Sequence, residues 1–397
     1  MYKFVYILHC YYNRKVYNFK YRETYRFKRD EGERIMSKTW KIAVIGCGMF
    51  ANAQYLPNIT KEANAELTAV VDIVEERALK AQKKYNAKEC YFSVDELLEK
   101  CDFDIAIDVT NIQAHHEINM KILGAGKHLI SQKPAAPNVE MLTEQIELAK
   151  KMNVKYVCVP IHPMRYDINT AKQWMKGGVI GNPYYVKCNM SHGGPEYFQY
   201  RDADPSWFFE PGAGALVDMG VHGLQIVTTL FGPAKKFVCM AKVTTPERMV
   251  RSGAFDGKMI QADMLPDHYV ITLDFGDKMA VVETGFSQKA SKSPRIEIFG
   301  DKGTISFTEP YMENPTPEVY MDDIEKGIRG WMTPAKGAKP AKPIISQCCC
   351  LGDIVDAIEN DKQPVLSPEH ARHVLEIMCK IPEAIESGNT IELKTVF

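Results

Sequence analysis

The sequence predicts an α/β protein in which a doubly wound parallel sheet precedes an α+β domain with a large, mainly antiparallel sheet. Two patterns carry this prediction. From Lys41 to about residue 160, short apolar runs alternate with helical patterns, as in sheets whose strands are buried on both faces. Beyond about residue 235, strand-like runs follow one another without helices. A chain of 397 residues has room for two such domains.

The N-terminal half contains strand-like and helical segments in alternation. The expected strands cover 41–45, 67–72, 105–110, 128–130 and 156–159. The expected helices cover 74–85, 94–100, 114–124 and 139–152, the last of which follows the helix-capping pair Pro137-Asn138. Because parallel strands need a crossover between them, this order predicts a doubly wound sheet.

The pattern changes after about residue 161. Expected helices cover 165–176 and 214–230, and each is followed by glycine. Expected strands cover 236–243, 268–275, 278–286, 295–299 and 304–308. Every second residue of 268–275 is apolar, which predicts one buried sheet face. Residues 334–343 are a low-complexity loop, and 351–360 and 368–386 are expected as closing helices.

Composition narrows the class of partner. The chain is 45% hydrophobic and 25% charged, and its mean hydropathy of −0.25 excludes a polytopic membrane protein. A net charge of −1 provides no global field toward nucleic acid or an anionic membrane. We therefore expect a small-molecule partner, with neither nucleic acid nor membrane as a partner.

Residues 1–35 differ from the rest of the chain. They hold nine Lys and Arg against four Asp and Glu, and seven of the 19 tyrosines. The apolar run 4–8 is too short for a signal peptide or a membrane span. Since Met36 directly precedes the first expected strand, we expect 1–37 to be an extension that the fold does not need. A basic, aromatic nucleic-acid arm is the alternative.

The eleven cysteines have neither a C-x-x-C pair nor zinc-finger spacing. They predict reduced thiols in a cytoplasmic protein and no metal site. The run Cys348-Cys349-Cys350 is expected to pack within a helix, because adjacent helical residues point about 100° apart and could not all face one ion.

A glycine-rich turn follows the first expected strand and opens a helix. It has the form G-x-G-x-x-A, in which Gly46 permits the tight turn, Gly48 lets a pyrophosphate approach the backbone, and Ala51 allows close packing. Asp72 ends the second strand, where a carboxylate binds an adenosine ribose and repels a 2′-phosphate. This Rossmann pattern predicts NAD as cofactor. The alternative is a turn that binds nothing, with Asp72 capping the next helix.

A second motif lies on the expected helix 214–230. Asp218 and His222 are four residues apart, so both side chains are expected on one helix face, and Gly220 between them leaves space for a ligand. Taken alone, the pair is equally typical of a structural contact, and a two-ligand metal site is a further alternative.

Together these motifs make residues 38–395 similar to the Gfo/Idh/MocA oxidoreductase family, which includes glucose-fructose oxidoreductase and inositol dehydrogenase. The similarity is carried by the glycine turn and by segments 126–134, 178–183 and 212–222. It implies that Lys133 contacts cofactor and substrate and that Asp218 and His222 act on a substrate hydroxyl. Gln132 stands where the family usually has Glu, and Thr110-Asn111 replaces the usual Thr-Pro.

The proposed chemistry follows from the residue types. Oxidising a secondary alcohol requires removal of the hydroxyl proton, which His222 can accept near neutral pH. Lys133 can stabilise the developing alkoxide, and Asp218 can orient or charge-stabilise the imidazole. The cofactor-binding set is predicted as Gly46, Gly48, Met49, Phe50, Asp72, Thr110, Asn111, His115, Gln132 and Lys133. Residues expected to line a sugar site are His162, Arg165, His192, Tyr197 and Trp207.

These inferences divide the chain into an NAD-binding domain, 38–160, and a substrate-binding and oligomerisation domain, 161–397. The leading hypothesis is an NAD-dependent oxidoreductase acting on a ring hydroxyl of a sugar, cyclitol or glycoside, with C3 of a glucosyl group as the nearest likeness. An NAD-dependent glycosidase or lyase that oxidises its substrate transiently is the alternative, and a sensor without turnover is a third hypothesis.

A homo-oligomer is expected, because an open apolar sheet face needs covering.

Overall fold

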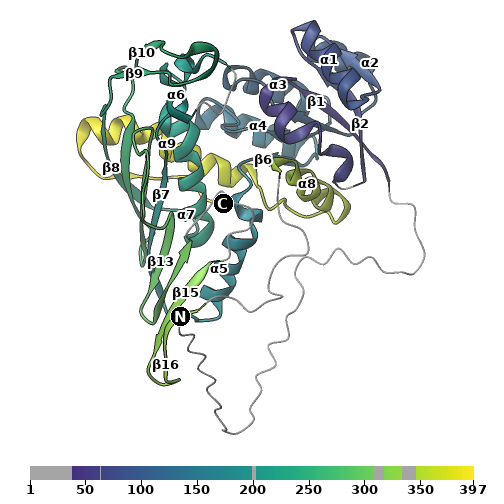
Figure 1. The fold of residues 1–397 in the computed structure, drawn as a ribbon. Helices are drawn as coiled ribbons and strands as arrows, with labels where there is room; N and C mark the ends of the chain where they lie inside the picture. Colours follow the sequence, from purple (N-terminus) through teal and green to yellow (C-terminus); the bar gives the residue numbers. More distant parts are fainter. Residues whose placement is uncertain (1–37, 63, 199–202, 308–316, 333–345) are drawn as a thin grey trace, which may run out of the picture. The chain divides into compact units, whose positions relative to one another are not determined.

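The structure, a computed structural model, describes residues 38–62, 64–198, 203–307, 317–332 and 346–397 (Figure 1). The expected extension 1–37, which includes Cys10, and the expected loop 334–343 lie outside these residues. The described chain from Thr39 onward contains a six-stranded and a nine-stranded sheet. The expected α/β fold class is confirmed.

The six-stranded sheet is parallel throughout, in the order β3-β2-β1-β4-β5-β6. Its strands are β1 Trp40–Ile45, β2 Ala65–Val71, β3 Glu89–Tyr91, β4 Ile105–Asp108, β5 His128–Ser131 and β6 Tyr156–Cys158. Its helices are α1 Glu75–Tyr85, α2 Val94–Lys100, α3 Ile112–Gly124 and α4 Val139–Lys151. The strand order reverses between β1 and β4, and ligands bind at the carboxyl ends of strands at such a point.

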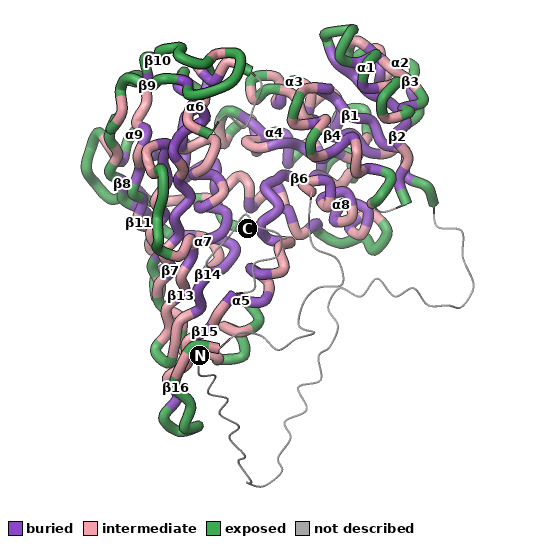
Figure 2. The backbone as a smooth tube through the Cα atoms, in the orientation of Figure 1, coloured by how far each residue is buried: buried purple, intermediate pink, exposed green. Residues whose placement is uncertain are grey.

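Alternate residues of β1 face two different cores. Ala43 and Ile45 pack with α2, α3 and α4 on one face of the sheet, whereas Ile42 and Val44 pack on the other. That second face is covered in part by the C-terminal segment, because α8 (Cys350–Glu359) and the fully buried Cys348 and Cys350 belong to the same core. The closing segment therefore returns to the first sheet, as the buried stretches of Figure 2 also show.

The nine-stranded sheet is mixed and mainly antiparallel, in the order β16-β15-β14-β13-β7-β12-β11-β8-β17, with β12 and β7 parallel. Its strands are β7 Pro183–Ser191, β8 Lys236–Lys242, β11 His268–Asp274, β12 Met279–Gly285, β13 Ile296–Gly300, β14 Gly303–Phe307, β15 Glu318–Asp323, β16 Ile328–Met332 and β17 Ile391–Glu392. A small hairpin is formed by β9 Glu247–Met249 and β10 Met259–Gln261. Its inner core also includes helices α5 Tyr166–Lys176, α7 Val221–Phe231 and α9 Pro368–Ser387.

Seven strands of the described chain were not predicted from the sequence. β3, β9, β10 and β17 are at most three residues long, β15 and β16 carry mixed side chains, and β7, although it alternates apolar and polar residues over 186–191, was not recognised. Their pairing partners stabilise them, and β7 lies in the middle of the nine-stranded sheet because β12 and β13 pair with its two edges.

Two π-helical turns stand where ordinary helix was expected. One, Ala51–Tyr55, follows the glycine turn, and the other, Leu216–Gly220, precedes α7. In the second turn the Val221 N–H bonds to the Leu216 carbonyl, five residues earlier. This widened turn carries Asp218, and such turns are frequent at functional sites.

Candidate active site

The glycine turn has the geometry of a phosphate cradle. Gly46 has φ +93°, and a Cβ there would lie 2.8 Å from the Val109 carbonyl oxygen, so the position favours glycine. A Cβ on Gly48 would meet no atom of the described chain within 4 Å. Gly48 therefore presents bare backbone toward open space, as close approach of a pyrophosphate requires. Met49 follows with an exposed side chain, and Phe50 is half-buried.

Asp72 lies beside this turn and joins it to the end of β2. One carboxylate oxygen accepts a hydrogen bond from Cys47 N at 2.8 Å, and the other accepts from Val74 N at 2.9 Å. The Val74 bond corresponds to the capping role considered from the sequence. A carboxylate has about four lone-pair sites, so these two bonds leave capacity for ribose hydroxyls. The cradle and the acid both fit NAD.

The segment after β4 is organised by buried Asp108. The Thr110 hydroxyl donates to Asp108 Oδ1 at 2.7 Å, and the Thr110 N–H donates to the same atom at 3.0 Å. Burial raises the pKa of Asp108 despite these bonds and the nearby His115. Asn111 caps α3 by accepting from Ala114 N at 3.1 Å. Thr110 and Asn111 thus shape the strand end that faces the switch point.

His115 and Gln132 support the segment that carries Lys133. The His115 ring is buried, with Nδ1 2.7 Å from the Pro134 carbonyl oxygen and Nε2 3.2 Å from the Thr110 carbonyl oxygen. The Gln132 side-chain amide donates to the hydroxyl of buried Tyr55. The structure gives both side chains a local role in holding the loop after β5.

Lys133 connects this loop to the π-helical turn. Its Nζ donates to the carbonyl oxygens of Val217 at 3.2 Å and Asp218 at 3.0 Å, and lies 3.3 Å from Asp218 Oδ1. Both side chains are largely buried, with 20% of Lys133 and 16% of Asp218 exposed. At this depth the ion pair is only weakly screened by solvent.

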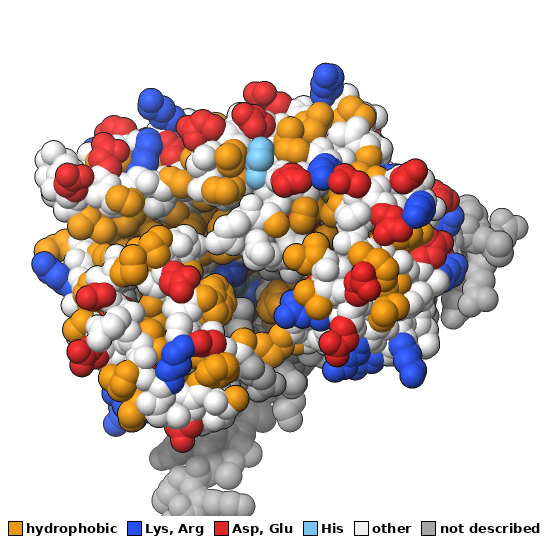
Figure 3. Space-filling model, turned by 90° about the horizontal axis from the view of Figure 1, so that it is seen from above, with side chains coloured by type: hydrophobic (Ala, Val, Ile, Leu, Met, Phe, Trp, Pro, Cys, Tyr) orange, Lys and Arg blue, Asp and Glu red, His pale blue; other side chains and the backbone are white. Residues whose placement is uncertain are grey.

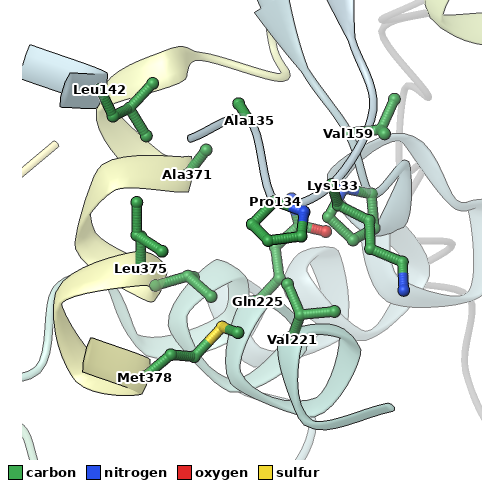
Figure 4. A pocket seen from close by; sticks show the side chains of 12 residues that line it. Lys133, Pro134, Ala135, Leu142, Val159, Val221, Gln225, Ala371, Leu375 and Met378 are labelled. Atoms are coloured by element: carbon green, nitrogen blue, oxygen red, sulfur yellow. The ribbon is translucent and has the colours of Figure 1, made fainter. Parts of the chain in front are cut away.

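A small pocket, partly open to solvent, lies behind the Lys133-Pro134 segment (Figure 4). Its walls come from the loop after β5 and from α4, α7 and α9, and they include Leu142, Val221 and Leu375. Figure 4 shows the Lys133 ammonium pointing away from these walls. The pocket therefore surrounds the base of the loop, while the charged end reaches Asp218.

His222 occupies the second position of α7 and contacts His162. The Nδ1 atom of His222 lies 2.8 Å from Nε2 of His162, with the rings nearly perpendicular. Burial, with smaller contributions from Lys133 and Arg165, lowers the pKa of His222 to about 3, and Asp218 acts in the opposite direction. His222 is therefore a neutral imidazole at pH 7.

The remaining expected substrate residues divide into two groups. His192 Nε2 lies 4.0 Å from Asp218 Oδ2, and its ring stacks on Phe286, so the structure brings it to the site. Arg165 is instead paired with buried Asp167. Tyr197 and Trp207 also lie in this part of the second domain.

These two aromatic residues present partly exposed faces. Tyr197 packs edge-on against Phe198 and lies beneath the guanidinium of Arg251, 5.2 Å from the ring centroid. Trp207 is 38% exposed and stacks on Phe208. Neither contact involves Lys133, Asp218 or His222, so their expected role in sugar binding stays a prediction.

A buried ion network near His192 was missed by sequence reasoning. Arg248 donates to Glu196 at 2.7 Å and to Asp267 at 2.5 Å, and all three side chains are at most 7% exposed. The network ties α6 (Pro195–Phe198) to β9 and to Asp267, which lies directly before β11. No local pattern could reveal it, because the partners are 52 and 19 residues apart.

Two features were sought among the described residues: a metal-binding cluster and a membrane-spanning helix. Within the described residues, no cluster of three or more His, Cys, Asp or Glu side chains is arranged to hold a metal ion. None of the described helices is long and apolar enough to cross a membrane. On the face seen in Figure 3, which is hollowed near its centre, basic and acidic side chains are interspersed.

Comparison with known proteins agrees with this geometry. Residues 40–159 match a family described as an oxidoreductase family with an NAD-binding Rossmann fold, and residues 168–306 match the GFO/IDH/MocA C-terminal domain. The chain is 24% identical to myo-inositol 2-dehydrogenase of Thermotoga maritima over 293 aligned residues. The alignment covers 73% of this chain and 80% of that protein.

Two further comparisons concern levoglucosan dehydrogenase. The enzyme of Pseudarthrobacter phenanthrenivorans is 25% identical over 332 residues, 79% of this chain and 80% of that protein. A solved structure of levoglucosan dehydrogenase in complex with NADH and levoglucosan has a TM-score of 0.76 at 19% identity, covering 90% of this chain and 100% of that chain. This structural likeness shows the shared fold.

Proposed function

Because the chain belongs to the Gfo/Idh/MocA oxidoreductase family and carries its NAD-binding Rossmann domain, we propose that it oxidises a secondary ring hydroxyl of a sugar, cyclitol or glycoside. One observation carries the proposal. The fold brings together three functional groups from segments about 85 residues apart: the ammonium of Lys133, the carboxylate of Asp218 and the neutral imidazole of His222. These are the groups that alcohol oxidation needs.

The cofactor fits the first sheet. The backbone of the Gly46–Gly48 turn would hold the pyrophosphate, and Asp72 would accept hydrogen bonds from the adenosine ribose. Met49, Phe50, Thr110 and the loop carrying Lys133 surround the same edge of the sheet. Bound NAD supplies the hydride acceptor.

His222 is proposed as the base. Its Nδ1 is occupied by His162, so Nε2 is the nitrogen that can take the hydroxyl proton. A neutral ring is ready to accept a proton at pH 7, and negative charge developing on the substrate oxygen raises the proton affinity of the ring during the reaction. Once the ketone has formed, the low pKa of about 3 favours release of the proton to solvent.

Lys133 is proposed to stabilise the alkoxide. Its ammonium is held by two carbonyl oxygens and by Asp218, so it is oriented before the substrate arrives. A preorganised cation facing a developing oxyanion contributes more in a water-poor site than in bulk water. Asp218 pairs with this lysine and lies 4.0 Å from His192, which places a second imidazole beside the proposed substrate position.

The substrate class is supported by the relatives. Myo-inositol 2-dehydrogenase and levoglucosan dehydrogenase are named for ring substrates with secondary hydroxyls. The partly exposed aromatic side chains of Tyr197 and Trp207 are of the kind that packs against the C–H faces of a pyranose. Within this class we propose a glycoside oxidised at C3 of its glucosyl group.

A panel of ring polyols tests the proposal. Full-length protein with NAD is offered levoglucosan, myo-inositol, glucose and aryl glucosides, and nicotinamide reduction and products are followed together. A 3-oxo glycoside formed with stoichiometric NADH is expected, and a C3-deuterated glucoside should react more slowly and place deuterium on the cofactor. Release of the aglycone without net NADH would instead support the transient-oxidation lyase, and no NAD reduction by any ring polyol would contradict the proposal.

A further inference from the structure

His162 lies beneath His222 and contacts it directly. It follows β6 in a short 3₁₀ turn, His162–Met164, whereas His222 belongs to α7, 60 residues later. The ring nitrogens are 2.8 Å apart, a full hydrogen-bond distance. His162 is 5% exposed, so its burial favours this contact over a direct contact with the substrate.

The two rings share one proton. Burial, His222 and Arg165 hold the pKa of His162 well below its ordinary range, and His222 is neutral as well. Two neutral imidazoles joined through Nε2 of one and Nδ1 of the other have a single N–H between them. If the shared proton is on Nδ1 of His222, then Nε2 of His222 has a lone pair. If the shared proton is on Nε2 of His162, then His222 has its own N–H at Nε2 and cannot act as a base there.

The charges facing the pair favour the first arrangement. Lys133, from the loop after β5, and Arg165, before α5, both act on His222 as cations, and Asp218, from the π-helical turn, acts as the opposing anion. The Lys133 ammonium stabilises a lone pair at the free nitrogen of His222 more than it stabilises an N–H. In this arrangement the N–H of His162 is on Nδ1, which is buried and has no hydrogen-bond partner among the described residues, and the charges must offset the cost of that unmet donor.

We infer that His162 is a positioning residue that accepts a hydrogen bond from the Nδ1–H of His222 and thereby leaves the Nε2 lone pair of His222 for the substrate proton. This inference rests on the proposed role of His222 as the base. In the step, the hydroxyl proton moves to Nε2, the carbon-bound hydrogen leaves with its electron pair to NAD, and the carbonyl forms. His162 remains neutral and stabilises the resulting imidazolium as a hydrogen-bond acceptor.

The tautomer can be observed without turnover. Protein labelled with ¹⁵N-histidine and saturated with NAD is measured by NMR, and the His222 signals are assigned by their loss in His222→Asn. The inference predicts the proton on Nδ1 of His222 in the wild type. A proton found on Nε2 of His222 would overturn this inference. The NMR result is independent of turnover: if no sugar in the panel is oxidised, only the proposed function is contradicted.

Kinetics supply the second test. His162→Phe removes the hydrogen-bond acceptor, so kcat should fall roughly 10- to 100-fold while KM changes less than about threefold. This loss is smaller than the roughly 10²–10⁴-fold expected when the proposed base His222 itself is removed. The Gln amide oxygen can accept the same bond, so His162→Gln should recover most of kcat. If the Phe variant does not fold, the Gln variant and the wild-type tautomer still decide.

A matched control separates positioning from packing. His370 on α9 is also a buried histidine, and its Nε2 lies 2.7 Å from the Thr228 hydroxyl, further along α7. His370→Phe should lower the melting temperature and leave kcat near the wild-type value. Equal loss of kcat in His162→Phe and His370→Phe, or wild-type kcat in a folded His162→Phe, would refute the positioning role while leaving the sugar oxidation intact.

Discussion

Replacing Lys133 by Met tests the centre of the proposed site most directly. Methionine keeps the unbranched shape of the side chain but removes the ammonium, which makes three hydrogen bonds with Val217 and Asp218. Because carbonyl groups and a carboxylate hold this charge in place before the substrate binds, its loss should fall mainly on the transition state rather than on ground-state binding.

The magnitude follows from comparable oxyanion donors. Removing one costs about 10²–10³ in kcat, or about 2.7–4 kcal/mol, so Lys133→Met should lower kcat to that extent. The same change removes a cation that lowers the pKa of His222. That pKa should therefore rise from about 3 toward its ordinary 6.5, although burial, the larger cause, remains. Since the neutral ring is the base, the acidic limb of kcat/KM should move to higher pH.

The assay is single-turnover hydride transfer with the best substrate of the panel, recorded from pH 5 to 9 together with the NAD dissociation constant and the melting temperature. Lys127→Met is the matched control, because Lys127 precedes β5 at the opposite end of the same strand and donates to the Phe103 carbonyl at 2.6 Å. The control should retain turnover. Wild-type hydride transfer by a folded Lys133→Met protein would refute the assigned role.

The other predictions concern the cofactor cradle, the buried ion network and the outer sheet face. Asp72→Ser should weaken NAD binding and relax discrimination against NADP, and equal wild-type affinity for the two cofactors would contradict its assignment. Gly48→Ala should weaken NAD binding with little change in melting temperature, because the added Cβ meets only open space, whereas Gly46→Ala should destabilise the fold itself. Arg248→Met leaves two buried carboxylates unpaired and should cost about 3–5 kcal/mol in urea unfolding; a loss below about 1 kcal/mol would show that the network relaxes. Met240→Glu places a charge on the outer face of β8, where Met240 is 73% exposed, and should shift a homo-oligomer toward monomer in sedimentation; an unchanged assembly would place the interface elsewhere.

Features that depend on neighbouring residues could be predicted from the sequence. Strand β1 is buried on both faces and therefore reads as a continuous apolar run. Gly46 adopts φ +93° at a strand-to-helix turn, and this requirement is visible as a glycine at fixed spacing. The helix α2, Val94–Lys100, has the expected bounds because Ser93 caps it from the adjacent position.

The family resemblance proposed Lys133, Asp218 and His222 as the reactive residues but could not predict their contacts. Asp218 and His222 were expected on one face of an α-helix, yet Asp218 lies in a π-helical turn and pairs with Lys133, while His222 bonds to His162. A local π-turn depends on how Leu216 and its neighbours pack against the sheet below. No spacing rule in the sequence encodes that packing.

The sequence by itself determined the fold class and the glycine turn of the nucleotide-binding domain, because each depends on local backbone conformation or on a short motif, and the family resemblance proposed Lys133, Asp218 and His222 as the reactive groups. Only the tertiary structure decided which ring nitrogen of His222 is free, what holds the Lys133 ammonium, and where the ion network of Arg248 lies. These contacts join residues 19 to 85 positions apart. They form because separate strands, helices and loops bring side chains from distant parts of the chain into contact, and only the folded chain creates these short distances.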